Sequence, residues 1–195
     1  PILGLQSPSV GGWVEVGRTT LGSVGDDITI SSLPDKRYYM VLSDLIGDGA
    51  NTQRIRLGSG SIDTGSNYAK RVSKGGGTDS TAINQADIDV NTGFEGTDDD
   101  SFLVTYIANL SAKEKLLQTS WVNKNGVGAG NAPYRIECVG KWANTSNPLD
   151  TFNQHNTAVG NYDTGSEVVI LGWDPEDAHT TNFWEELSST SLSGS

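Results

Sequence analysis

The chain has 195 residues, with 13 Lys or Arg against 24 Asp or Glu, so its formal net charge at pH 7 is −11. This length allows one domain with a substantial core. The negative charge and the lack of a basic stripe exclude a nucleic-acid-binding surface and disfavour an anionic membrane. No apolar run reaches the roughly 18 residues that a membrane span needs.

Short apolar windows separated by Gly, Ser, Asn, Asp and Thr follow one another along the chain. They lie at 13–21, 27–32, 37–45, 53–58, 68–73, 102–109, 115–122, 134–143, 150–156 and 166–173. Helical signal is confined to one turn at 111–116 and a short helix or turn at 175–179. This pattern predicts an all-β fold of about ten strands with very little helix. An antiparallel β-sandwich is expected, with a jelly roll as the leading topology.

The sequence predicts burial for two of the strand windows and for the single cysteine. Residues 38–42 and 168–171 are apolar at successive positions, which is typical of central strands packed on both faces. Cys138 is the only cysteine. It shares alternation with Tyr134, Ile136 and Trp142, so we expect a small buried hydrophobic residue and not a nucleophile.

The segment 74–101 lacks this alternation and is rich in Gly and Asp. We expect a long exposed loop, and such loops often carry binding function. Its candidate contact residues are Asp79, Asp98, Asp99 and Asp100. A solvated connector without function is the alternative.

The end of the chain restates its beginning. Trp, Glu, Thr and Leu of the segment 13–21 recur in the segment 184–192 at a constant offset of 171 residues. We therefore expect one β-sandwich domain over 1–195, with 1–12 as an N-terminal arm and 183–195 as a C-terminal strand that resembles the first strand or begins a second copy. The interface candidates are Trp13, Leu21, Trp184, Leu187 and Leu192. A chance match is the alternative.

The tetrapeptide Asp-Thr-Gly-Ser occurs twice, at Asp63 and at Asp163. Aspartic proteases carry this motif in two loops whose carboxylates share a water. Here no strongly apolar strand precedes either copy. A turn in which Asp caps its own backbone and Gly takes a positive φ explains both copies more simply.

Other apparent motifs are weaker. The glycines of 126–130 precede a strand and not a helix, which predicts a hairpin loop instead of a phosphate site. His155 and His179 have no partner at metal-ligand spacing. Oxygen ligands of the kind that Ca²⁺ prefers are present at Asp44, Asp48, Asn51 and the run 98–100, but without EF-hand spacing. A calcium ion bound in a loop is therefore an open alternative. The sequence predicts no catalytic, cofactor-binding or metal-binding residue.

The chain holds five tryptophans, namely Trp13, Trp121, Trp142, Trp173 and Trp184. Exposed tryptophans would serve as stacking platforms for sugars, whereas a structural domain would use them as core or interface anchors. Alternation favours the core for Trp142.

Several segments resemble β-rich virion proteins of tailed viruses and proviruses of marine bacteria and archaea. They are the start at 1–4, the strand 13–21, and the segments 63–69, 141–147 and 165–172. The resemblance covers most of the chain through short motifs.

This resemblance implies a non-enzymatic structural protein on the virion surface, as a capsid decoration, head fibre or tail-fibre component. The implied partners are other virion proteins and copies of itself, with a trimer favoured. The start at Pro1 lacks a basic region, which predicts synthesis in the host cytoplasm without a signal peptide. No cofactor is expected.

Two alternatives belong to other classes. One is a module that binds carbohydrate or a host receptor, such as a host-surface glycan. The other is an enzyme, either aspartic protease-like or a glycosidase with a carboxylate pair.

Overall fold

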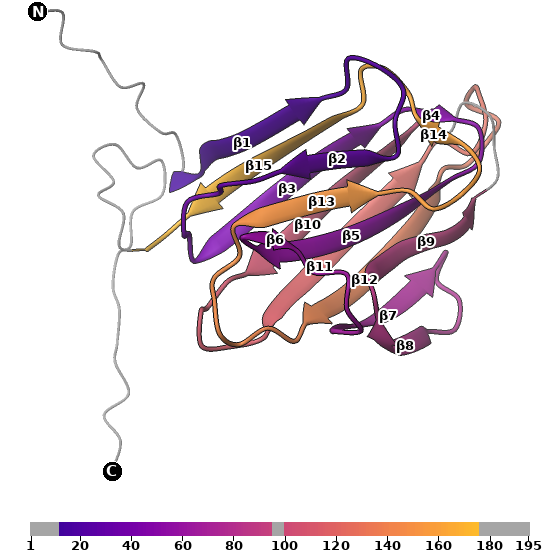
Figure 1. Ribbon diagram of the computed structural model, residues 1–195. Coiled ribbons are helices and arrows are strands. Elements are labelled where there is room, and N and C mark those ends of the chain that lie inside the picture. Colours follow the sequence, from indigo (N-terminus) through magenta and orange to yellow (C-terminus); the bar gives the residue numbers. More distant parts are fainter. Residues whose placement is uncertain (1–11, 95–99, 176–195) are drawn as a thin grey trace, which may run out of the picture.

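The computed structural model describes residues 12–94 and 100–175 (Figure 1). Within them, all ten predicted windows coincide with strands. The strands are β1 (Val14–Thr20), β2 (Asp27–Ile30), β3 (Tyr38–Leu45), β4 (Gly47–Asp48), β5 (Asn51–Ser59), β6 (Ser61–Ile62), β7 (Tyr68–Lys74), β8 (Ser80–Gln85), β9 (Ile88–Phe94), β10 (Ser101–Ala108), β11 (Lys115–Asn123), β12 (Tyr134–Trp142), β13 (Thr151–His155), β14 (Asn161–Tyr162) and β15 (Glu167–Trp173).

Thirteen of these strands form two packed antiparallel sheets, which confirms the β-sandwich, and β4 and β14 pair separately with each other. The large sheet has the order β1-β15-β3-β10-β11-β12-β7-β8, and the small sheet has the order β2-β13-β5-β6 with β9 also paired to β5. Figure 1 shows the small sheet lying across the large one. The orders β1-β15-β3-β10 and β2-β13-β5-β9 are those of a jelly roll, in which the chain winds repeatedly from one sheet to the other.

Two insertions widen the large sheet. The β11–β12 pair continues from β10 as a meander, and the β7–β8 hairpin adds to the far side of β12. The large sheet therefore extends beyond the jelly-roll strands, and its outer face is much broader than that of the small sheet.

The core lies between the sheets and is built by strict alternation. Along β11, every second residue is buried, from Lys115 through Leu117 and Trp121 to Asn123. A Cβ on Gly140 of β12 would lie 2.7 Å from the Cδ1 atom of Ile88 on β9, so glycine permits this close approach of the two sheets. Tyr68 of β7 donates its hydroxyl proton to the carbonyl oxygen of Leu57 on β5 at 2.9 Å and ties the sheets together.

Three predictions are corrected by the fold. The segment 74–101 is not one long loop, because it contains β8 and β9, and Ile88 and Val90 of β9 are fully buried. The helical turn at 111–116 is wrong, since β11 begins at Lys115. The outer faces of β3 and β15 are only half-buried in the described residues, so packing on both faces is not found there.

Several predicted features fall outside the described residues. They are Trp184, Leu187 and Leu192 with the segment 183–195, the arm 1–12 except Gly12, the helix or turn at 175–179 beyond Pro175, and both Asp98 and Asp99. Within the described residues, no helix has the length and hydrophobicity needed to cross a membrane.

Candidate binding face on the large sheet

The outward side chains of the large sheet are mostly apolar. The register places Leu171, Met40, Tyr106, Gln118 and Val139 side by side across five neighbouring strands. Because alternate residues of a strand share a face, all five point away from the core. Four of the five are apolar, which is unusual on a face that no second layer of the described fold covers.

The next row along the strands continues this pattern. It runs from Trp173 through Tyr38, Ala108 and Leu116 to Lys141. The exposed fractions of Leu116, Tyr106 and Val139 are 57%, 50% and 50%. An apolar patch of this extent on a folded surface marks an interaction site.

These rows line a groove of about 850 Å³, which we call the outer groove. Its apolar lining includes Trp13, Tyr38, Tyr106, Leu116, Val139 and Trp173. Its cationic side chains are Arg71 and Lys141, because the ammonium of the lining residue Lys70 is paired with Asp89 of β9, and no carboxylate lines the groove. The outer groove therefore suits an occupant with apolar side chains and negative charge.

Aromatic rings gather at the end of the groove next to β1. The ring centroids of Tyr38 and Trp173 are 5.4 Å apart with nearly parallel planes, and Trp13 lies 6.2 Å from Trp173. Such pairs add about 0.5–1.5 kcal/mol beyond the area that they bury. The packed rings give this end of the groove a firm wall.

A smaller polar hollow of about 410 Å³ adjoins the groove over β11, β12 and β7. Arg71, Asp79, Gln118 and Glu137 are among its lining residues. Arg71 pairs with Asp79 at 3.3 Å, and both side chains are about half exposed. This face thus offers apolar surface with hydrogen-bonding groups along one flank.

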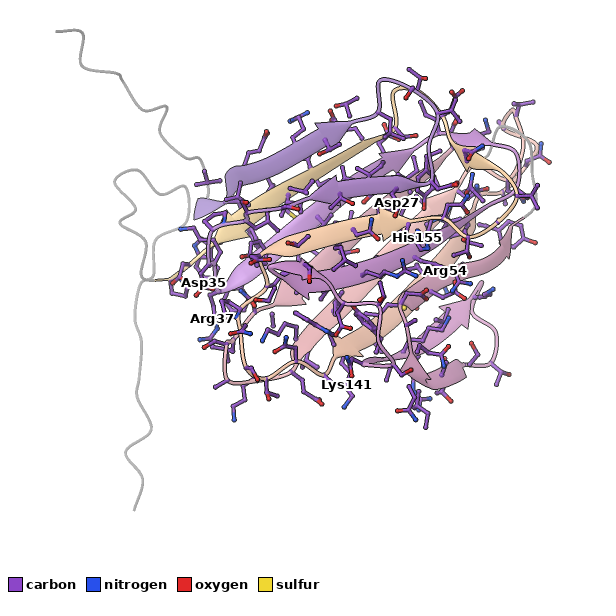
Figure 2. The ribbon with its side chains drawn as sticks, viewed as in Figure 1. Asp27, Asp35, Arg37, Arg54, Lys141 and His155 are labelled. Atoms are coloured by element: carbon purple, nitrogen blue, oxygen red, sulfur yellow. The ribbon has the colours of Figure 1, made fainter. Side chains whose placement is uncertain are left out.

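The outer face of the small sheet has the opposite chemistry. Asp27, His155, Arg54 and Asp89 follow one another across β2, β13, β5 and β9, and Figure 2 shows the first three along one line. His155 Nδ1 lies 3.0 Å from Asp27 Oδ1, and Arg54 Nη1 lies 3.0 Å from Asp87 Oδ1. Charged side chains on this face therefore form ion pairs with one another.

The two Asp-Thr-Gly-Ser motifs form turns at opposite ends of the large sheet. Asp63 accepts hydrogen bonds from Gly65 N at 2.8 Å and from Trp142 Nε1 at 2.7 Å. Trp142 lies beyond the end of β3 marked by Tyr38, whereas Asp163 bonds Ile46 just past the other end. The carboxylates therefore cannot share a water, and both turns cap their own backbone as predicted.

The turns differ in two details. Gly165 has a φ of +93°, as the turn interpretation expects, but Gly65 is not among the glycines with positive φ. Burial would raise the pKa of Asp63, but hydrogen bonds from Trp142, Gly65 and Asn67 outweigh burial and lower that pKa. Asp63 is therefore held as a structural carboxylate.

Cys138 is buried as predicted, and burial raises the pKa of its thiol to about 12. Tyr134 does not share this burial, because it lies exposed at the start of β12. Lys115 is buried against Trp142, and its ammonium donates to the carbonyl oxygens of Lys113 and Asn144. Desolvation lowers the pKa of Lys115.

The remaining predicted site residues are dispersed. Trp13 lines the outer groove, while Leu21 packs against the core. Asp79 and Asp100 are both exposed, at 46% and 53% of their side-chain surface, and Asp100 pairs with Lys124 at 3.0 Å. In the parts of the chain that the structure describes, no three His, Cys, Asp or Glu side chains are grouped as metal ligands.

The groove itself was not predicted as a site. Its sequence signal is the apolar character of both faces of 38–42 and 168–171, which by itself predicts packing on two sides. Residues such as Leu116 and Val139 give no such signal, because the outward positions of their strands also hold polar residues such as Gln118 and Glu137.

These features define a jelly-roll β-sandwich with one broad apolar outer face. No family model, no curated protein and no solved structure matches the chain.

Proposed function

We propose that this chain is a non-enzymatic structural protein of a viral particle surface that acts by binding polypeptide through the outer groove. The observation that carries the proposal is the apolar outer face of the large sheet, with Tyr106, Leu116 and Val139 at least half exposed. The resemblance of several segments to virion proteins supports the viral setting, and a jelly roll is a fold used by capsid proteins.

Assembly fits the chemistry of this face better than catalysis does. Burying the apolar side chains stabilises a contact by roughly 25 cal/mol per Å² of apolar surface. A groove with apolar walls, three aromatic rings at one end and cations along it provides both affinity and orientation. The two Asp-Thr-Gly-Ser turns lie too far apart to act as a protease pair.

The test is the solution mass of the full chain by light scattering over a range of concentrations. We expect self-association at high concentration, where polypeptide of one chain can enter the groove of another, and Leu116→Asp with Val139→Asp should shift it to concentrations about tenfold higher or more. Val24→Asp is the matched control, because Val24 is 46% exposed but lies outside the groove. Equal association of all three proteins would overturn the groove as the contact surface.

The viral setting has its own test. The protein should be found by mass spectrometry in purified particles of the virus that encodes it, in many copies per particle. Its absence from intact particles would reject the structural role while leaving the binding face in place.

One observation favours a second candidate, a glycan-binding module. Tyr106 is half exposed and stands beside Gln118, which lines the polar hollow together with Arg71 and Asp79. An aromatic ring next to hydrogen-bonding groups is suited to a sugar. A glycan that shifts the amide signals of β10 and β11, and that fails to do so with Tyr106→Ala, would favour this function.

A further inference from the structure

We propose that the outer groove is covered by residues 176–195 of the same chain. This inference rests on the proposed function, since it names the polypeptide that the groove binds. It is carried by three properties of the chain: where the described part ends, how far the following residues can reach, and which side chains they bring.

The described chain ends at the rim of the groove. Trp173 lines the groove and is the last residue of β15. Asp174 accepts a hydrogen bond from the Arg37 backbone N–H at 3.2 Å, which fixes the exit point beside β3. Residue 176 is therefore only three positions along the chain from Trp173 at the aromatic end of the groove. Binding of the segment 176–195 to the groove would be intramolecular.

The following segment is long enough to cross the sheet. Its twenty residues can extend about 65–70 Å at roughly 3.3–3.6 Å per residue. From β15 to β8 there are six strand spacings, or about 29 Å at ~4.8 Å each. The segment can thus lie over the whole groove with slack for turns.

Its side chains match the lining. Residues 176–195 include Phe183, Trp184, Leu187 and Leu192 and carry four carboxylates with no Lys or Arg. The groove offers apolar walls, with Arg71 and Lys141 and without a carboxylate. Both cations already have exposed acidic partners, Asp79 and Glu114, and exposed pairs of this kind exchange partners at little cost.

The other terminal segment fits less well. Residues 1–11 contain no charged side chain and no aromatic ring. Starting from Trp13, they reach about 36–40 Å when fully extended, which barely spans the seven strand spacings from β1 to β8. They therefore provide neither the anchors nor the charge that the groove accepts.

The experiment uses the full chain with a photoreactive benzophenone maleimide on Gln118→Cys, a groove-lining position on β11. Cys138 stays unlabelled, because it is buried and its thiol pKa is raised to about 12. The matched control is Val122→Cys, on the same strand and face but outside the groove lining. The protein is held at about 1 μM, far below the millimolar effective concentration of a tethered segment.

We expect the probe at position 118 to crosslink to residues 176–195, and mixing isotope-labelled with unlabelled chains should show that both ends belong to one chain. Trp184→Ser with Leu187→Ser should lower this yield about tenfold, which corresponds to ~1.4 kcal/mol for the lost aromatic anchor. The control probe at position 122 should give little of this product.

Each other outcome overturns the inference in a distinguishable way. Crosslinks to residues 1–11 or to a second chain would keep the groove as a polypeptide-binding surface and replace its occupant. Equal yields at positions 118 and 122 would show contact without docking. No crosslink to any polypeptide, together with an association unaffected by Leu116→Asp and Val139→Asp, would reject both the inference and the proposed function.

Discussion

The two outer faces of this sandwich invert the usual relation between polarity and exposure. On the small sheet, Asp87 and Asp89 are charged and yet only 8% exposed, because Arg54, Arg56 and Lys70 surround them. On the large sheet, Leu116 is apolar and 57% exposed. A polar face that pairs its own charges needs no partner, whereas an apolar face left open is stabilised by acquiring one.

The inside and outside of β11 give the largest contrast. Leu117→Ala should lower the free energy of unfolding by about 2–5 kcal/mol, because Leu117 is in the core and its loss leaves a cavity. Leu116→Ala, one residue away on the outer face, should cost less than about 1 kcal/mol. Urea unfolding of both variants measures the difference. Similar losses would mean that the outer face is packed as tightly as the core.

The charge network of the small sheet should be the next most sensitive feature. Asp87→Ala leaves Arg56 without its carboxylate partner and leaves Arg54 only the longer contact with Asp89 at 3.6 Å, and both arginines are mostly shielded from solvent. We expect a loss of about 2–4 kcal/mol, because breaking a buried ion pair strands the remaining charge. Asp79→Ala, which removes the exposed partner of Arg71, is the control and should cost under ~0.5 kcal/mol. Equal losses of unfolding free energy for the two variants in urea would show that the small-sheet network stabilises the fold no more than the exposed pair does.

Asp63 tests whether a paired polar group on the large-sheet side behaves like the small-sheet network. Asp63→Asn should cost about 1–3 kcal/mol at pH 7, because three N–H donors lose a carboxylate acceptor. The pKa of Asp63 is lowered in the fold, so its contribution is complete above the ordinary Asp pKa of about 3.9. The contribution disappears as the pH falls through the lowered pKa.

The measurement for Asp63 is the urea midpoint of wild type and variant between pH 7 and pH 2. The gap between the two proteins should narrow only in the most acidic part of this range. A gap that is constant with pH would show that the ionised carboxylate is not what stabilises the turn.

The smallest effect is expected where charges sit on the open edge of the large sheet. Arg18 pairs with Glu15 and Glu167, both at 2.8 Å, but its side chain is 47% exposed. Arg18→Ala should lower the urea midpoint only slightly, and this loss should vanish at 1 M salt, where the Debye length is about 3 Å. A salt-independent loss would assign Arg18 a packing role instead.

The strands were predictable because their signal is local. Each of the ten windows alternates or is apolar over its own few residues, and each became a strand. The main exception is β9, because Asp89, together with Asp87 just before the strand, interrupts its apolar residues and makes the sequence resemble a loop. Only the cations of β5 and β7 explain why these two acids can be buried.

The binding face shows the same limit. Leu116 comes from β11 and Val139 from β12, and the two residues are 23 positions apart in the sequence. They become one surface only when the register brings five strands side by side. Likewise, the identical sequence around Asp63 and Asp163 could not reveal that the two turns lie at opposite ends of the sheet.

The sequence by itself determined the all-β class, the ten main strands, the buried state of Cys138 and the turns at both Asp-Thr-Gly-Ser motifs, since alternation and turn chemistry act over a few residues. The tertiary structure alone decided the jelly-roll winding, the broad large sheet, the partners that bury Asp87 and Asp89, and the groove on the outer face. These depend on which distant strands pair and in which register, and pairing is set by the packing of the whole core, which no short segment encodes.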